Sequence, residues 1–300
     1  MDDKSLRVGF IGAGRAANTL ALGLHQNGYR VTSVASRTLA SAQTLAMYIN
    51  GCIPHKTPQE VADDCDFVFI TTPDDAIESI VKSVNWHTTT GVAHCSGAEP
   101  ALVLEAARLQ GAHIGSFHPM QTFPTISHET TRLSGIAFAV EGASPMLDTL
   151  IKMANALGGF PVEISPEYRA IYHLTGFLAC GAVITIMSQA AELWNIIGYT
   201  KDKGLEVLIP ILKSTVESLE TRGIPEALTG PISRGDLGTV QKHLDSLEDQ
   251  AGSMIPIYCE IALGAVALSR AKGGIDDSRA QEITTLLQNQ LARAKTLPVS

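Results

Sequence analysis

A glycine-rich turn between an apolar strand and a helix is the feature that most constrains the fold of this chain. Residues 8–11 predict a short buried strand, and residues 18–27 predict a helix with an apolar face. Between them, Gly12, Gly14 and Ala17 follow the spacing G-x-G-x-x-A. In a dinucleotide-binding unit the first glycine allows a tight turn, the second lets the backbone approach a pyrophosphate at the helix start, and the alanine permits close helix–strand packing. This stretch therefore predicts a nucleotide-binding βαβ unit.

The end of the second predicted strand, residues 29–35, indicates which dinucleotide is bound. NAD-binding chains usually carry Asp or Glu about 20 residues past the glycines, where it holds the ribose 2′-hydroxyl. This chain has Ser36 and Arg37 there, and a hydroxyl with a guanidinium suits a 2′-phosphate. We therefore expect NADP(H) as the cofactor; the alternative is that Arg37 is an idle surface residue. The predicted cofactor-binding residues are Gly12, Gly14, Arg15, Ala16, Ala17, Ser36 and Arg37, with Thr72 and Pro73 from a later loop.

Strands alternate with helices as far as residue 165. This alternation predicts an α/β fold with a doubly wound, mostly parallel Rossmann sheet. Thr72 and Pro73 follow an apolar strand at 66–71, and loops at the carboxyl ends of parallel strands are where such sheets bind ligands. Further strands are predicted at 53–55, 91–95, 113–117, 136–140 and 161–164.

From residue 166 onward the pattern is almost entirely helical. The sequence thus predicts two domains, an NADP-binding Rossmann domain at 1–165 and an all-helical substrate and dimerisation domain at 166–300. Residues 170–191 contain no Asp, Glu, Lys or Arg. An uncharged stretch of this length would be long enough to span a membrane. Because the stretch includes His173 and several other polar residues, we expect a buried central helix of an α-domain instead.

Composition excludes several classes of partner and site. The net charge of −8 and the lack of a basic stripe argue against nucleic acid and anionic membranes. Five widely spaced cysteines without a C-x-x-C pair, and an N-terminus without an apolar leader, predict a cytoplasmic protein. We expect no metal site, because the nine histidines lack ligand spacing, and no serine hydrolase, because G-x-S-x-G is missing.

Two histidines are the predicted catalytic residues. His173 lies four residues after Arg169, so both share one helix face, where His173 could give a proton and Arg169 could bind a substrate carboxylate. His118 follows the sixth strand at the ligand edge of the sheet. The alternatives are that His173 is a hydrogen-bonded core histidine and that His118 is a turn residue.

Two further residues are candidates for substrate binding. Ser96 follows the fifth strand, and Gly97 beside it would permit close approach of a ring. Arg234 lies beside the rigid Gly230-Pro231 turn and could hold an anionic substrate. The neighbouring Asp236 is also a good helix N-cap, which alone would explain this motif.

Taken together, these motifs resemble a bacterial family in which a Rossmann-like domain precedes an all-helical domain of unknown function. That family is similar to pyrroline-5-carboxylate reductase, prephenate dehydrogenase and the β-hydroxyacid dehydrogenases. The resemblance implies an NADP-linked oxidoreductase that forms a homodimer through the helical domains. It departs at Arg169 and His173, where β-hydroxyacid dehydrogenases carry Lys and Asn, and at Gly181 in Ala-Cys-Gly, where relatives tend to have Asn. The segments that carry the resemblance are 12–17, 36–38, 94–98, 116–123, 172–173 and 230–236.

The function expected from these residues is NADP(H)-dependent hydride transfer to or from a small oxo- or imino-acid, with a ketopantoate-like 2-oxo acid as the preferred type. Two alternatives stay open. One is a non-catalytic NADP-binding interaction protein, suggested by the missing Lys and Asn. The other is a prephenate-type oxidative decarboxylating dehydrogenase, suggested by the His-Pro-Met run at 118–120.

Overall fold

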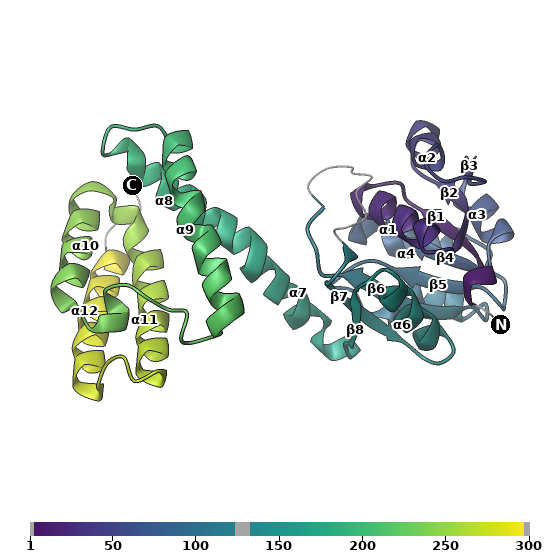
Figure 1. The fold of residues 1–300 in the computed structure, drawn as a ribbon. Coiled ribbons are helices and arrows are strands. Elements are labelled where there is room, and N and C mark those ends of the chain that lie inside the picture. Colours follow the sequence, from purple (N-terminus) through teal and green to yellow (C-terminus); the bar gives the residue numbers. More distant parts are fainter. Residues whose placement is uncertain (1–2, 124–132, 297–300) are drawn as a thin grey trace. The chain divides into compact units, whose positions relative to one another are not determined.

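A computed structural model describes residues 3–123 and 133–296 of the chain, which form two compact units, Met1–Gly181 and Ala182–Ser300. The first unit is built on an eight-stranded sheet in the order β3-β2-β1-β4-β5-β6-β7-β8 (Figure 1). All neighbours pair in parallel except β6 and β7. The predicted doubly wound, mostly parallel α/β fold is confirmed. The strands are β1 (Arg7–Ile11), β2 (Arg30–Ala35), β3 (Ile53–His55), β4 (Phe67–Ile70), β5 (Gly91–His94), β6 (His113–Pro119), β7 (Ala137–Gly142) and β8 (Phe160–Glu163).

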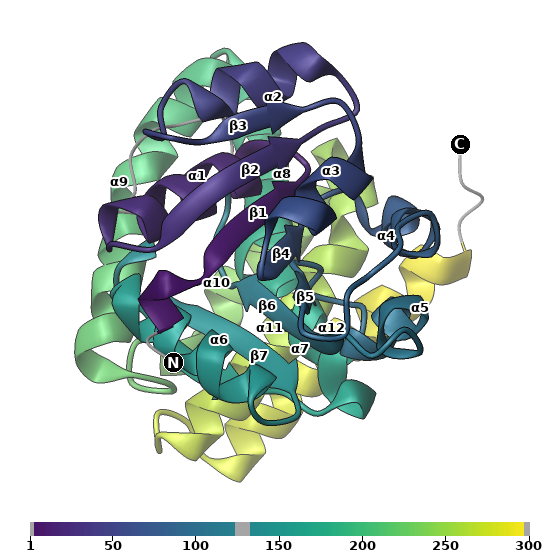
Figure 2. The same cartoon turned by 90° about the vertical axis from the view of Figure 1, so that its right-hand side faces the viewer.

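Helices cover both faces of this sheet. The core on one face includes side chains of α1, α2 and α6, and the core on the other includes side chains of α3, α4 and α5. Figure 2 shows α4 and α5 on the opposite side of the strands from α1. Both core clusters consist almost entirely of apolar side chains, as expected for central strands that are covered on both faces and have unbroken apolar sequences. The helices are α1 (Arg15–Gln26), α2 (Leu39–Ala46), α3 (Pro58–Asp64), α4 (Asp74–Lys82), α5 (Glu105–Arg108), α6 (Met146–Ala156) and α7 (Arg169–Phe177).

Local sequence signals set where these helices begin. The Thr38 hydroxyl accepts from the Ser41 amide at the start of α2, and Thr57 with Glu60 forms a complete capping box at the start of α3. Pro73 precedes α4, whose first turn carries Asp74. Acidic side chains in the first turn stabilise a helix, because they interact favourably with the positive end of its dipole. These starts place the loops after β2 and β4 at the carboxyl edge of the sheet, where the predicted cofactor residues lie.

The second unit is helical. Its core is formed by α10, α11 and α12, which lie side by side in Figure 1. The predicted helical composition after residue 166 is therefore confirmed. The first compact unit extends to Gly181 and so includes residues 166–181. The predicted end of the cofactor domain at residue 165 stays a prediction. The helices are α8 (Val183–Glu192), α9 (Lys201–Arg222), α10 (Leu237–Gln250), α11 (Ile255–Ala271) and α12 (Asp277–Thr296).

The prediction of a buried helix over 170–191 is wrong for the single chain. Two helical runs, Pro166–Asn195 and Gly252–Ala271, are long and apolar enough to cross a membrane by length and composition, and the apolar window of the first is 0% buried. Phe177 and Ile184 are 56% and 67% exposed. An apolar sequence signals that a helix needs an apolar neighbour, but it does not say whether the same chain provides it.

Candidate functional site: a dinucleotide loop and a histidine pair in the sheet unit

The glycine turn after β1 has the geometry that backbone approach to a ligand requires. Gly12 has a φ of 115°, and a Cβ there would lie 2.7 Å from the backbone carbonyl of Thr71, so only glycine fits. Gly14 is the N-cap of α1. Among the described residues no side chain caps this helix start, and no atom lies within 4 Å of a Cβ placed at Gly14. The helix start is therefore open toward an anion.

Asn18 holds this turn in place, and sequence reasoning missed it. Its side-chain amide is buried and donates to the carbonyl oxygens of Ala13 and Gly14, at 3.0 and 2.8 Å. From the other side, the Thr71 hydroxyl donates to the Gly12 carbonyl at 3.0 Å. The available signal was a polar residue on the buried face of an otherwise apolar helix, where a polar group is normally present to pair with backbone.

The loops after β2 and β4 complete the cofactor half of the site. The hydroxyl of Thr72 is buried and has no hydrogen-bond partner within residues 3–123 and 133–296. Arg37 is exposed, and in these same ranges no ion pair or hydrogen bond holds its side chain. A buried unpaired hydroxyl and a free guanidinium, beside an open helix start, fit a phosphorylated dinucleotide. Ser36 and Pro73 lie in the same two loops.

Ser96 organises the loop after β5. Its hydroxyl donates to the Asp74 carboxylate at 2.7 Å and accepts from the amides of Ala98 and Glu99, at 3.3 and 3.2 Å. The hydroxyl is thus engaged by three partners within the protein. This arrangement gives Ser96 a positioning role, because it ties the loop to the start of α4 and leaves Gly97 at its tip.

His94 is part of the same support. Its Nδ1 accepts from the Ser96 amide at 3.1 Å, so its Nε2 carries the proton and donates to the Pro100 carbonyl at 3.1 Å. The ring is 0% exposed, and burial lowers the pKa of His94 to about 4. Both ring nitrogens are used, as expected for a histidine that belongs to the structure and not to the reaction.

Arg169 is the largest of the fully buried side chains, at 1% exposure. Its guanidinium donates to the carbonyl oxygens of Ser96 (2.7 Å) and Glu99 (3.2 Å) and to the Ser116 hydroxyl. The Glu141 carboxylate lies 3.9 Å away, and burial raises the pKa of that carboxyl group. A guanidinium enclosed in this way fits a role in joining α7 to the loop after β5 and to β6. Its buried Nη1 has no hydrogen-bond partner among the described residues, and the predicted substrate contact of Arg169 stays a prediction.

The predicted catalytic histidines meet at Gly97. A Cβ at Gly97 would lie 2.8 Å from Nε2 of His118 and 2.5 Å from Cδ2 of His173. The two rings are 5.9 Å apart at their centroids and nearly perpendicular, at 78°. Residues from β6 and α7, 55 positions apart in sequence, are thereby brought together at the carboxyl edge of the sheet.

The two histidines differ in environment. His173 is exposed. His118 is half-buried, its Nδ1 lies 2.9 Å from the hydroxyl oxygen of Tyr172, and burial together with the charge of Arg169 lowers the pKa of His118 to about 3. His118 is therefore a neutral ring at physiological pH. Tyr172 was not among the predicted site residues, although its position directly before His173 was an available signal.

Arg234 lies in the other compact unit. It is exposed and ends a short 3-10 helix, Ile232–Arg234. The Asp236 side chain accepts from the Thr239 amide and caps α10, which accounts for part of this motif structurally. The predicted role of Arg234 in substrate binding stays a prediction.

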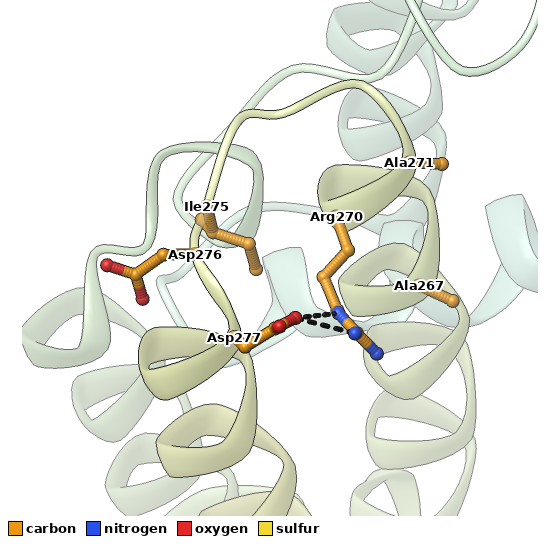
Figure 3. Close-up of a pocket in the computed structure, with 6 residues that line it drawn as sticks. All are labelled: Ala267, Arg270, Ala271, Ile275, Asp276 and Asp277. Atoms are coloured by element: carbon orange, nitrogen blue, oxygen red, sulfur yellow. Dashed lines mark hydrogen bonds and ion pairs between the residues drawn. The ribbon is translucent and has the colours of Figure 1, made fainter.

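Two hollows of the helical unit contain none of the predicted site residues. One, of about 570 Å³, is shallow and is lined by Arg270 and Asp277, which are paired at 2.6 Å (Figure 3). The other is an apolar groove of about 220 Å³ lined by α8 and α11 residues such as Ile186 and Ile261. Within the described parts of the chain, no three His, Cys, Asp or Glu side chains are grouped as metal ligands would be.

Comparisons with known proteins agree with this geometry. Residues 7–92 match the model of the coenzyme F420-dependent NADP oxidoreductases, and residues 136–264 match DUF2520, a domain of unknown function. No curated protein matches the sequence.

Solved structures share the whole architecture. A Bacteroides fragilis protein provisionally assigned as an NADP oxidoreductase is 25% identical, with a TM-score of 0.65, over 90% of this chain and 98% of its own. Pyrroline-5-carboxylate reductase from Streptococcus pyogenes (14%, TM-score 0.60) covers 97% of this chain and 99% of its own. A reductive aminase from Aspergillus terreus, solved with NADPH (15%, TM-score 0.60), covers 96% and 94%.

The expected resemblance is thus confirmed. Residues 7–92 of this chain are similar to the F420-dependent NADP oxidoreductases, residues 136–264 are similar to DUF2520 domains, and the fold is that of pyrroline-5-carboxylate reductase.

Proposed function

We propose that this protein is an NADP(H)-dependent oxidoreductase that transfers a hydride to or from a small oxo- or imino-acid, with a ketopantoate-like 2-oxo acid as the preferred substrate type. The observation that carries the proposal is the meeting of His118 and His173 at Gly97. This pair lies at the carboxyl edge of the same sheet whose β1 and β4 loops fit a dinucleotide.

The residues divide into three roles. The backbone at Gly14, Arg15 and Ala16 would hold the pyrophosphate, and the bound cofactor supplies the hydride. His173 is exposed and can exchange protons with solvent, so it is the proposed proton donor, with His118 beside the same reacting group. Ser96 and Arg169 position the loop that carries Gly97.

The loop after β2 supports NADP(H) over NAD(H). Arg37 is free to make charged hydrogen bonds with a 2′-phosphate, and Ser36 precedes it after β2. The match to NADP oxidoreductases over residues 7–92 is consistent with this choice. Arg234 remains the proposed anchor for the substrate carboxylate.

A panel of small 2-oxo acids and cyclic imino acids, assayed for NADPH oxidation, tests the function. A positioned proton donor typically contributes 10²–10⁴ in rate, so His173→Ala should lower kcat at least about tenfold, and His118→Ala should also slow turnover. His113→Ala is the matched control, because His113 begins β6 at the end opposite His118. If the two site variants turn over at the rate of the control, the catalytic assignment is wrong.

We also propose that the protein is a cytoplasmic homodimer. The support is the exposed apolar face of the run 166–195, which includes Ile171, Leu174 and Phe177 at 57%, 44% and 56% exposure. Apolar patches of this kind mark interfaces. Light scattering on the purified chain should give twice the monomer mass, and a monomer at micromolar concentration would contradict the proposal.

A further inference from the structure

We infer that Tyr172 fixes His118 with its Nε2–H directed at Gly97, and that this donor selects a carbonyl oxygen over an iminium nitrogen. The inference rests on the proposed function and deepens it. It names Tyr172 as a positioning residue and restricts the substrate class to oxo compounds, although two of the proteins that share the fold are named for imine or amine chemistry.

The ring of His118 has one nitrogen held by the protein and one facing the site. Nδ1 lies 2.9 Å from the Tyr172 hydroxyl oxygen, and the two rings meet edge to face with centroids 5.6 Å apart. Nε2 lies 2.8 Å from where a Cβ at Gly97 would be. A Cβ at Gly97 would clash with this nitrogen and with the His173 ring, so glycine is what lets the two rings pack against the loop after β5.

The direction of the Tyr172 bond decides which nitrogen carries the proton. In the described parts of the chain, the Tyr172 hydroxyl has no second hydrogen-bond partner. If the hydroxyl accepted from Nδ1, its own hydrogen would have no acceptor in the protein, although the side chain is half-buried. We take the phenol as the donor to Nδ1, the direction in which its own hydrogen is paired. A neutral imidazole with an acceptor Nδ1 carries its proton on Nε2.

The surrounding charges keep this ring neutral. The cost of burying a charge disfavours an added proton on His118. Arg169 and His173 of α7, together with His94 of β5, disfavour it further. Of the carboxylates packed around the site, Asp74 accepts from Ser96, and Glu141 accepts from the Ala101 amide through one oxygen while its other oxygen lies 3.9 Å from Arg169. His118 therefore offers a hydrogen bond and does not act as a titrating acid.

This donor discriminates between the two substrate types. A carbonyl oxygen has lone pairs, and it gains negative charge as a hydride adds to its carbon, so an N–H donor stabilises the reaction more than the ground state. An iminium nitrogen has no lone pair and often carries its own N–H, so it would meet Nε2–H donor to donor. In the reduction, the C=O π bond breaks, a C–H bond forms, and the oxygen takes its proton from His173.

Nitrogen-15 NMR of the full-length protein, labelled at histidine, tests the tautomer without any substrate. The His118 resonances are assigned by their loss in His118→Gln. We expect a neutral ring with the proton on Nε2 from pH 6 to 8, and a mixture of tautomers in Tyr172→Phe. Tyr168→Phe, an exposed tyrosine four residues earlier, is the control and should leave the spectrum unchanged. A proton on Nδ1, or a charged ring at pH 6, would overturn the inference.

Turnover with NADPH tests the substrate class. We expect kcat/KM for a 2-oxo acid to exceed that for a cyclic imino acid of equal carbon number by at least about tenfold, since a donor left facing a donor is costly. Tyr172→Phe should lower kcat for the oxo acid more than it changes KM, and His118→Gln, which keeps an N–H, should retain more activity than His118→Ala.

The outcomes separate this inference from the function on which it rests. Equal or faster reduction of the imino acid would overturn the carbonyl assignment while supporting the oxidoreductase. Turnover of neither class would overturn the proposed function and the substrate class with it, and the tautomer would then be decided by the NMR result alone.

Discussion

The cofactor half and the substrate half of the site lie on the same sheet edge but are built in opposite ways. The glycine turn of the proposed cofactor half comes from one short stretch, in which Gly12, Gly14 and Asn18 lie within seven residues and the backbone would do the binding. The substrate half joins the loop after β5, the end of β6 and the first turns of α7. Three segments that are distant in sequence meet there because buried Arg169 bonds to two of them.

This difference predicts different failures. A local turn depends on conformations that individual residues can adopt, so single substitutions should affect binding strongly. A site joined by a buried charge depends on that charge staying paired, because breaking a buried polar network leaves unsatisfied groups on several elements.

Removing Arg169 should have the largest effect on stability. Arg169→Met leaves two carbonyls, the Ser116 hydroxyl and Glu141 without their partner, and we expect a loss of about 3–5 kcal/mol. Urea unfolding followed by Trp86 fluorescence, in a Trp194→Phe background, reports the sheet unit alone. Arg108→Met is the control, because Arg108 makes an exposed pair with Glu105 and its loss should hardly change the urea midpoint. Equal losses for the two variants would show that Arg169 does not join the substrate half.

The next largest effect is expected at the glycine turn. Gly12→Ala forces a side chain into a φ of 115° and against Thr71, which should cost about 1–3 kcal/mol of stability and also weaken NADPH binding. Gly14→Ala is the matched variant, since its backbone is extended and its surroundings are open. It should weaken NADPH binding in calorimetry while leaving the urea midpoint unchanged. If Gly14→Ala also unfolds early, the turn is not open as described.

Acid should loosen the substrate half through His94. The pKa of His94 is about 4 in the folded protein and about 6.5 in an unfolded chain, so between these pH values the unfolded chain binds more protons. Stability is therefore complete above pH 6.5 and falls as the pH drops, by about 2 kcal/mol at pH 5. His94→Gln should reduce this fall, and His113→Gln should not. The comparison is made from urea midpoints at pH 7, 6 and 5, and identical slopes for both variants would rule out His94 as the cause.

The smallest effect is expected at the cofactor's 2′-phosphate. Arg37→Ala should weaken NADPH binding about tenfold, the size of one charged hydrogen bond, and leave NADH binding unchanged. Arg30→Ala is the control, because Arg30 begins β2 and Arg37 follows its end. Titration of intrinsic fluorescence with each nucleotide measures both constants. An equal loss of affinity for NADPH and NADH would mean that Arg37 does not bind the 2′-phosphate.

Sequence patterns anticipated the two halves unequally. The strand–turn–helix at residues 8–27 could be read because periodicity and glycine spacing are local properties. Asn18 and Tyr172 were missed because their importance depends on which backbone carbonyl or ring they face. The exposure of the run 166–195 was also missed, because apolar composition alone does not identify the surface that covers it.

The sequence by itself determined the doubly wound sheet, the helical second half and a turn that only glycine can form at Gly12. Tertiary structure alone decided three features of the site. Arg169 is buried and hydrogen-bonded to the loop after β5 and to β6, both ring nitrogens of His94 have hydrogen-bond partners, and the rings of His118 and His173 pack against Gly97. The physical reason is that backbone conformation follows from neighbouring residues, whereas burial and hydrogen-bond pairing depend on residues that the fold brings together from far apart.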